Sequence, residues 1–150
     1  MDIPENEFDI ISLYGTTTIG IASCNFGTFF FQLGDGEIFT ISNNEIKKAF
    51  PKQTQIIDFQ TDSLCQPNAH LKAQTNFVFP NTTTPFIFAC TDGFSNSFSN
   101  DNELFNTVLA YKELAQTHSP DFIGQNLPRW LQETSQTGSG DDISIGILWH

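Results

Sequence analysis

Basic residues are scarce in this chain of 150 residues, which has six Lys and Arg against seventeen Asp and Glu and a formal net charge of −11. Nucleic acids and anionic membrane surfaces are bound through basic patches, so this charge balance argues against both as partners. No apolar stretch approaches the roughly 18 residues that a membrane-spanning helix needs. The segment Met1–Tyr14 has four acids, no Lys or Arg and no apolar signal-peptide core, so we expect a cytoplasmic protein.

Paired cysteines are also absent. Cys24, Cys65 and Cys90 are odd in number and widely spaced, which indicates reduced thiols rather than a disulfide framework. Cys90 stands two residues before Asp92 and can be imagined as a nucleophile, but its place in an apolar run favours a buried structural thiol. Phosphate-loop, dinucleotide-binding, hydrolase-elbow and zinc-protease motifs are missing as well, which removes the common nucleotide and protease sites.

What the chain does have is phenylalanine, with 16 residues, and a length that fits one domain able to bury roughly two-thirds of its unfolded surface. Alternating or continuous apolar runs predict strands. The expected strands are Thr16–Ser23, Thr28–Leu33, Glu37–Ile41, Phe77–Phe79, Pro85–Thr91 and Ile143–Leu148. The rest of Ser42–Asn81 is expected to be loop with at most one further short strand.

Two helices are predicted in the C-terminal third. Asn100–Gln116 follows the helical period, and Asn100 with Glu103 resembles a capping box. A second helix begins at Ser119-Pro120 and reaches about Gln136, with Pro128 expected to kink or restart it. The consecutive Phe29-Phe30-Phe31 put apolar side chains on both faces of one strand, so we expect that strand to be covered on both sides. Together these elements predict an α+β fold of two packed antiparallel sheets with helices outside.

Three aspartates stand at the ends of these strands. Asp35 follows the Thr28–Leu33 strand, Asp92 follows the Pro85–Thr91 strand, and Asp141 precedes the last strand; each is flanked by glycine. Asp-Gly is the commonest turn dipeptide, so any one of them alone is explained by a turn. Three carboxylates on tight loops over a rigid sheet instead favour a site for a hard cation such as Mg²⁺ or Mn²⁺.

The order of four motifs along the chain then resembles a known family. The motifs are Tyr14-Gly15-Thr16-Thr17-Thr18, Leu33-Gly34-Asp35-Gly36, Cys90-Thr91-Asp92-Gly93-Phe94-Ser95-Asn96-Ser97-Phe98 and Gly138-Ser139-Gly140-Asp141-Asp142. In this order they resemble the metal-dependent type 2C family of protein serine/threonine phosphatases, in particular its compact bacterial branch. The segment Thr61–Cys65, before Asn68-Ala69, looks like that branch too.

The resemblance implies an αββα sandwich that holds a pair of Mg²⁺ or Mn²⁺ ions at one end. It implies that a water activated by both metals attacks the phosphorus of phosphoserine or phosphothreonine. By resemblance, Asp92 bridges toward the main metal site and Asp141 is a direct ligand. Asp35 would lie beside the ligands or at a more weakly held additional metal, and Asp142 and Gly93 would stand close to the site. Asn96 occupies a position where many members carry a further Asp ligand.

The sequence departs from the family pattern at its start. Family members carry an Asp-Gly-x-Gly turn before the Gly-Thr-Thr strand, and this turn supplies the carboxylate that bridges both metals. Only 13 residues precede Tyr14 here, and Asp9 has no glycine turn beside it. We therefore expect residues 1–150 to form a single, incomplete domain, the C-terminal two-thirds of a phosphatase with about half of its metal shell.

Three interpretations remain at this point. The chain is a phosphatase that works only when a complementary N-terminal segment is supplied, or a degenerate module that binds a phosphoprotein or partner without hydrolysis. The third is a small β-rich domain whose Asp-Gly turns are coincidental. Because an incomplete sandwich leaves apolar sheet surface and an unpaired edge, the chain alone is expected to self-associate, to bind a complementary chain or to be unstable.

Overall fold

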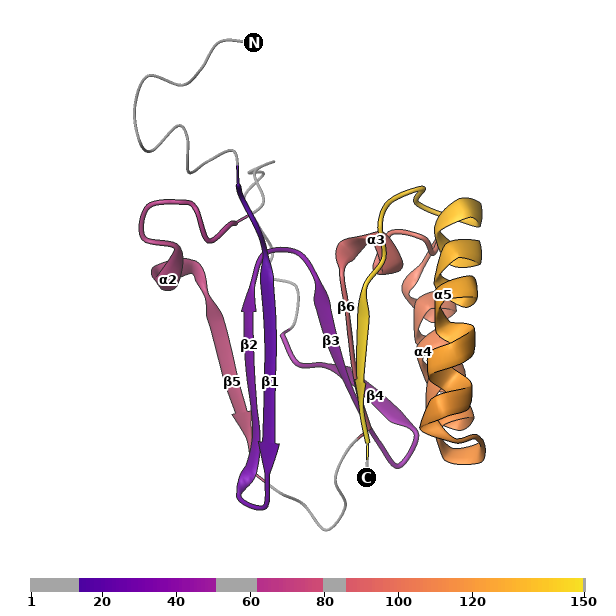
Figure 1. Cartoon of the computed structure of the whole chain (residues 1–150). Coiled ribbons are helices and arrows are strands. Elements are labelled where there is room, and N and C mark those ends of the chain that lie inside the picture. Colours follow the sequence, from indigo (N-terminus) through magenta and orange to yellow (C-terminus); the bar gives the residue numbers. More distant parts are fainter. Residues whose placement is uncertain (1–13, 51–61, 80–85, 150) are drawn as a thin grey trace. The chain divides into compact units, whose positions relative to one another are not determined.

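A computed structural model gives the fold of the chain and describes residues 14–50, 62–79 and 86–149. Asp9, Thr61 and Pro85, which the sequence analysis used, lie outside these ranges. The chain divides into two compact units, a first unit of Met1–Gly36 with Lys52–Phe79 and a second unit of Glu37–Pro51 with Pro80–His150. Figure 1 labels the helices and strands of both.

The first unit is built on a three-stranded antiparallel sheet in the order β1-β2-β5. Its elements are β1 (Thr18–Cys24), β2 (Gly27–Leu33), the short helix α2 (Ala69–Lys72) and β5 (Gln74–Val78). A two-residue turn joins β1 to β2, and Gly27 follows it with φ +147°. A Cβ on Gly27 would lie 2.6 Å from the backbone carbonyl oxygen of Val78, so this position requires glycine.

The two faces of this sheet differ. Phe30 is fully buried, and Thr28 and Gln32 on the same face are buried with it. On the opposite face Leu33 is 2% exposed but Phe29 is 41% exposed, so the prediction that this strand is covered on both sides fails at Phe29. Three consecutive Phe residues supply apolar side chains to both faces, because successive side chains of a strand point to opposite faces of the sheet. That pattern says nothing about whether an element exists to cover the second face.

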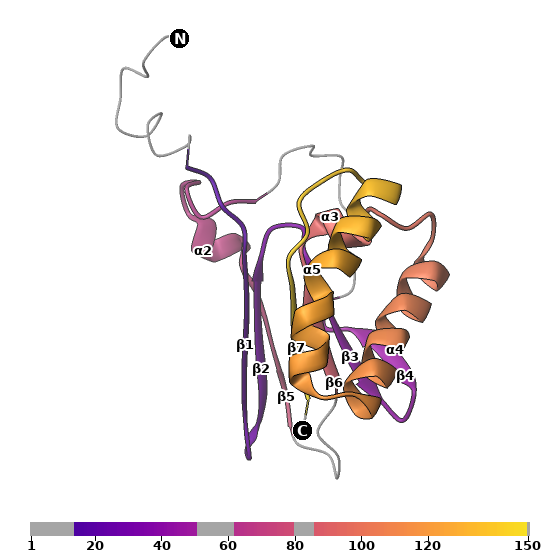
Figure 2. The same cartoon turned by 45° about the vertical axis from the view of Figure 1, so that its right-hand side comes forward.

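The second unit is a four-stranded antiparallel sheet, in the order β4-β3-β6-β7, with two long helices against one face (Figures 1 and 2). Its elements are β3 (Glu37–Ser42), β4 (Glu45–Lys48), β6 (Phe86–Cys90), α3 (Asp92–Ser95), α4 (Asp101–Thr117), α5 (Pro120–Thr137) and β7 (Ile145–Leu148). Every residue of β6 is buried, as expected for a central strand. Phe88 packs against Phe94 and Tyr111, which joins the sheet to α3 and α4.

Both long helices begin where their capping residues predict. The Asn100 side chain accepts a hydrogen bond from the Glu103 N–H at 3.1 Å, and Ser119 Oγ accepts one from the Phe122 N–H at 3.3 Å. The second helix continues through Pro128 as one element rather than restarting there. The predicted strands and helices are present, and the α+β fold class with two antiparallel sheets is confirmed.

A buried ion pair lies beside the central strand of the second unit. Lys48 Nζ is 3.0 Å from one Glu37 carboxylate oxygen and donates a 3.1 Å hydrogen bond to the other, with side-chain exposures of only 14% and 10%. The same ammonium lies 5.8 Å from the ring centroids of Phe39 and Phe105. Each charge is therefore compensated inside an aromatic environment, where an unpaired charge is costly.

We expect Lys48→Met to lower the free energy of unfolding by about 3–5 kcal/mol, because it removes the ammonium from a largely buried ion pair. The double variant Lys48→Met with Glu37→Gln should recover most of that loss. Lys47→Met is the matched control, since Lys47 pairs with Glu45 at 66% and 69% exposure and should cost less than about 1 kcal/mol. Urea unfolding measures all three, and equal effects at Lys47 and Lys48 would contradict the buried pair.

Candidate metal centre

The pairing of β6 with β7 brings two of the predicted aspartates together. The strands are antiparallel with Cys90 opposite Ile145, so the end of β6 lies beside the beginning of β7. Asp92 opens α3 directly after β6, and Asp141 lies in the loop that leads into β7. The Thr91 N–H donates to the Ser144 carbonyl at 3.0 Å and extends the ladder toward both loops.

Gly93 is the point where the two loops touch. A Cβ on Gly93 would lie 2.4 Å from the carbonyl oxygen of Asp142 and 3.3 Å from the Cβ of Asp141. No side chain fits at the first distance, because the obstacle is backbone. The absence of a side chain at Gly93 therefore allows Asp92 and Asp141 to stand on adjoining backbones.

Serine hydroxyls join the same two loops. Ser97 Oγ and Ser139 Oγ each donate to the Gly93 carbonyl at 2.7 Å and lie 3.0 Å from each other. Ser135 Oγ donates to the Asp141 carbonyl at 2.7 Å, and the Asp141 N–H donates to Ser139 Oγ at 3.3 Å. The role of these serines was not predicted from the sequence. In the sequence, a loop held by serine hydroxyls is indicated only by the serine and glycine content of residues 135–140.

The carboxylates themselves are oriented by their own backbones. Asp92 Oδ1 accepts the Gly93 N–H at 3.0 Å, and Asp141 Oδ1 accepts the Asp142 N–H at 2.8 Å. Asp92 is half-buried, whereas Asp141 and Asp142 are exposed. In the described part of the chain, none of the three forms an ion pair with Lys or Arg. Neighbouring carboxylates without a protein cation form an electronegative site that favours a bound cation.

The donor set suits a hard divalent ion but does not enclose one. Mg²⁺ commonly takes one or two protein carboxylates and keeps several waters, which matches Asp92 and Asp141. Within the described ranges, no group of three or more His, Cys, Asp or Glu side chains is placed to hold a metal. Asp92 and Asp141 are thus the two predicted ligands that residues 86–149 place on adjoining backbones.

The other predicted site residues stand as follows. Asp142 contributes its carbonyl oxygen, which lies 3.5 Å from Thr91 Oγ1 as a hydrogen-bond acceptor. Asp35 is exposed and belongs to the first unit, in a turn where Gly34 adopts φ +103° against Thr17. Its role near a metal stays a prediction. Asn96 is exposed at the end of α3.

Cys90 is a buried structural thiol, as the apolar run predicted. It is 1% exposed, and burial, followed by the neighbouring Glu37 carboxylate, raises the pKa of the thiol to about 12. The reactive thiolate is therefore negligible near neutral pH. Cys90 is not a nucleophile for this site.

Comparison with known proteins assigns the chain to a family. The family model described as Protein phosphatase 2C matches residues 7–132, so the chain belongs to that family. Among proteins of curated function, none matches this sequence.

Three solved structures share the fold. The catalytic domain of the serine/threonine phosphatase PstP, in complex with two manganese ions, is 14% identical with a TM-score of 0.61, covering 93% of this chain and 63% of that one. The Mycobacterium tuberculosis phosphatase PstP/Ppp is 12% identical with a TM-score of 0.59, covering 95% and 66%. The phosphatase domain of SpoIIE from Bacillus subtilis is 17% identical with a TM-score of 0.50, covering 94% and 61%. The chain thus spans less than two-thirds of the length of each.

We expect Gly93→Ala to lower the free energy of unfolding by about 1–3 kcal/mol, because the added methyl must push the Asp142 carbonyl away. Gly124→Ala is the matched control. A Cβ at Gly124 meets nothing within 4 Å and lies in the exposed part of α5, so this change should be neutral or stabilising by up to about 1 kcal/mol. Thermal and urea unfolding compare the two variants. A Gly93→Ala protein as stable as the wild type would mean that the two loops are not in contact.

We expect iodoacetamide at about pH 8 to alkylate Cys24 in the native protein and to leave Cys90 unmodified, because Cys24 is exposed and Cys90 is buried. Peptide mass spectrometry after brief labelling measures both positions. Unfolding in urea should make the two thiols react alike. Rapid native labelling of Cys90 would contradict the closed packing around β6.

Proposed function

We propose that this type 2C phosphatase domain binds Mg²⁺ or Mn²⁺ and belongs to a phosphatase that hydrolyses phosphoserine or phosphothreonine in proteins. The observation that carries this proposal is the contact of Gly93 with Asp141 and Asp142, which puts Asp92 beside Asp141 at the adjoining ends of β6 and β7. Family membership supports it, and so does the fold shared with PstP, a phosphatase solved with two manganese ions.

In this proposal Asp92 and Asp141 hold the metal through carboxylate oxygens. A bound pair of divalent ions supplies a water of lowered pKa and neutralises charge on the phosphoryl group. The hydrogen bonds of Ser97, Ser135 and Ser139 hold the two loops in place, so that the carboxylates are positioned before an ion arrives. Asp142 adds negative charge beside Asp141 and favours the bound cation over the empty site, whereas the role of Asp35 rests on the family resemblance alone.

We further propose that residues 1–150 alone bind metal without turnover. The 150 residues contain no Asp-Gly-x-Gly turn, and the described part brings together two carboxylates rather than the set that two ions need. A complementary N-terminal phosphatase segment would supply the bridging carboxylate, with a phosphoprotein as substrate. In the described ranges no helix is long and apolar enough to span a membrane, and a cytoplasmic location remains part of the proposal.

The alternative is a degenerate module that binds a phosphoprotein or partner and does not hydrolyse it. The small number of converging carboxylates in the described residues favours this alternative. Adding a complementary N-terminal segment distinguishes the two possibilities. Its metal ligands would restore turnover if the chain is part of a phosphatase, but not if the chain is a degenerate binding module.

Calorimetric titration of Mn²⁺ and Mg²⁺ tests the metal site. We expect the wild type to bind, Asp92→Asn to lose binding by about tenfold or more, and Asp121→Asn to bind like the wild type. Asp121 is the matched control because it is an exposed carboxylate in the first turn of α5. Asp92→Asn should also be as stable as the wild type or more stable without metal, since it relieves repulsion among the acids.

Turnover of p-nitrophenyl phosphate and thermal unfolding are measured on the same samples. Binding lost in Asp92→Asn with no turnover in the wild type supports a half site. Metal-dependent turnover by the wild type would show that the 150 residues complete the site themselves. A melting temperature indifferent to millimolar Mn²⁺ would reject a metal site in this chain, because a bound ion stabilises the folded state by mass action.

A further inference from the structure

A single hydroxyl group links the backbones that carry the two candidate metal ligands. Ser139 Oγ donates a 2.7 Å hydrogen bond to the carbonyl of Gly93, the residue that follows Asp92. The same oxygen accepts a hydrogen bond from the Asp141 N–H at 3.3 Å. A hydroxyl has one proton to donate and lone pairs that accept, so both bonds form at once. The loop of Asp92 and the loop of Asp141 are therefore joined through one side chain.

Ser97 holds Ser139 in this place. Ser97 Oγ donates to the Gly93 carbonyl at 2.7 Å and accepts the Ser139 N–H at 3.2 Å. A Cβ on Gly138 would lie 2.4 Å from the Cβ of Ser97 and 2.7 Å from its carbonyl oxygen, so the loop reaches Ser97 only because residue 138 is glycine. The Ser97 hydroxyl therefore fixes the backbone of Ser139, and the Ser139 hydroxyl in turn joins the two loops.

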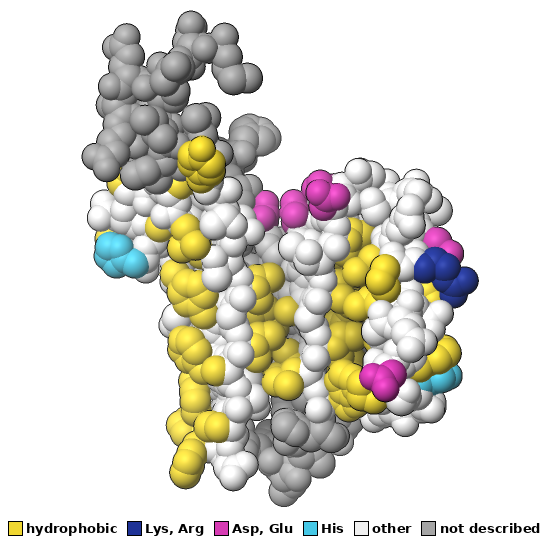
Figure 3. Space-filling model, viewed as in Figure 1, with side chains coloured by type: hydrophobic (Ala, Val, Ile, Leu, Met, Phe, Trp, Pro, Cys, Tyr) yellow, Lys and Arg dark blue, Asp and Glu magenta, His cyan; other side chains and the backbone are white. Residues whose placement is uncertain are grey.

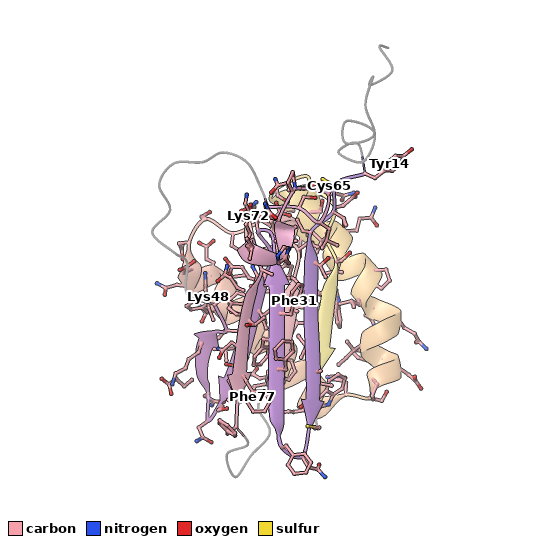
Figure 4. The ribbon with its side chains drawn as sticks, turned by 90° about the vertical axis from the view of Figure 1, so that its left-hand side faces the viewer. Tyr14, Phe31, Lys48, Cys65, Lys72 and Phe77 are labelled. Carbon is pink, nitrogen blue, oxygen red and sulfur yellow. The ribbon has the colours of Figure 1, made fainter. Side chains whose placement is uncertain are left out.

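The two loops have no protein cation to hold them together in the described part of the chain. Lys48 Nζ lies 3.0 Å from a carboxylate oxygen of Glu37 instead. Lys72 Nζ lies 2.6 Å from a carboxylate oxygen of Asp62, and both lysines are labelled in Figure 4. Figure 3 shows acidic side chains at the top of the view with no basic side chain among them. Neighbouring carboxylates repel each other, and the Ser139 hydrogen bonds oppose that separation.

We propose that Ser139 is a positioning residue of the metal centre, whose hydroxyl sets the separation of Asp92 and Asp141 before an ion binds. This inference rests on the proposed function, because it requires that the two carboxylates bind the same metal centre. Mg²⁺ demands near-ideal octahedral geometry, so affinity is lost when the protein must first bring its ligands together. A link that holds the ligand loops in advance therefore raises affinity without touching the ion.

The exposure of Ser139 separates this role from a contribution to the core. Ser139 is exposed, whereas the hydrophobic core of the second unit is the buried cluster that includes Phe88 and Phe94. Substitution of an exposed side chain removes little apolar burial and changes stability little. We therefore expect Ser139→Ala to weaken metal binding and to leave the melting temperature of the metal-free protein almost unchanged. A purely structural residue would show the reverse.

Calorimetric titration of the 150-residue chain with Mn²⁺ tests the proposal. We expect Ser139→Ala to raise the Mn²⁺ dissociation constant by about five- to tenfold, and Ser139→Thr, which keeps the hydroxyl, to stay within about twofold of the wild type. Ser97→Ala should raise it by only about two- to threefold, because the link between the loops remains. Thr137→Val is the matched control, since the Thr137 hydroxyl bonds only to the Glu133 and Thr134 carbonyls within α5. Its dissociation constant should equal that of the wild type.

NMR spectroscopy of the metal-free protein tests the link itself. Ser139→Ala should shift the backbone amide resonances of Gly93 and Asp141 together and should speed hydrogen exchange at the Asp141 N–H, because the hydroxyl bonded to both residues is gone. Thr137→Val should leave both resonances in place. Thermal unfolding shows whether each variant folds, and Ser139→Ala should melt within about 2 °C of the wild type.

The possible failures are distinguishable. Equal Mn²⁺ affinity in Ser139→Ala and the wild type would overturn this proposal and leave the proposed function standing. A loss of affinity that Ser139→Thr does not recover would overturn it too, as would unchanged Gly93 and Asp141 resonances in metal-free Ser139→Ala. A wild type that binds no Mn²⁺ would overturn both the proposed function and the positioning role.

Discussion

The antiparallel pairing of β6 with β7 is the constraint on which the second unit depends. Because Cys90 stands opposite Ile145, the chain leaves β6 where it enters β7, although the two strands are separated in sequence by three helices. The same pairing buries every residue of β6 and places the loops of Asp92 and Asp141 at one sheet end. The β6–β7 pairing therefore positions both the core and the candidate metal centre, so a change that disrupts this pairing would disrupt both.

A few serine hydroxyls hold the loops of Asp92 and Asp141 together. Ser97 and Ser139 both donate to the Gly93 carbonyl, and Ser135 donates to the Asp141 carbonyl, so two short loops become one hydrogen-bonded body. Placing acids side by side is unfavourable without a counter-charge. The serines and the glycine–backbone contact at Gly93 provide the opposing restraint, which is the usual relation between a functional site and its support.

Most helices and strands of the fold can be predicted from the sequence, because their positions depend on residues that are close together in the chain. The capping residues Asn100 and Ser119 fix where α4 and α5 begin, and the apolar run of β6 marks the central strand. The proximity of Asp92 to Asp141 is not local, and it was suggested by their places at strand ends together with the order of the family motifs. The contact at Gly93 and the roles of the serines were not predicted, because they depend on a register between distant strands. The exposure of Phe29 was predicted wrongly, since a side chain's hydrophobicity does not reveal whether a neighbour covers it.

The two units carry unsatisfied surfaces of opposite kinds. Among the described residues, Asp92 and Asp141 of the second unit form no ion pair with Lys or Arg, and the first unit has exposed aromatic rings on a sheet without charge. A ligand that binds only the folded form stabilises it in proportion to the logarithm of its concentration over Kd. A bound cation would stabilise the second unit by reducing the repulsion between its carboxylates. An apolar partner would stabilise the first unit by removing phenylalanine side chains from water. The two responses differ in their dependence on salt and metal, so the contribution of each unit to stability is separable in the intact chain.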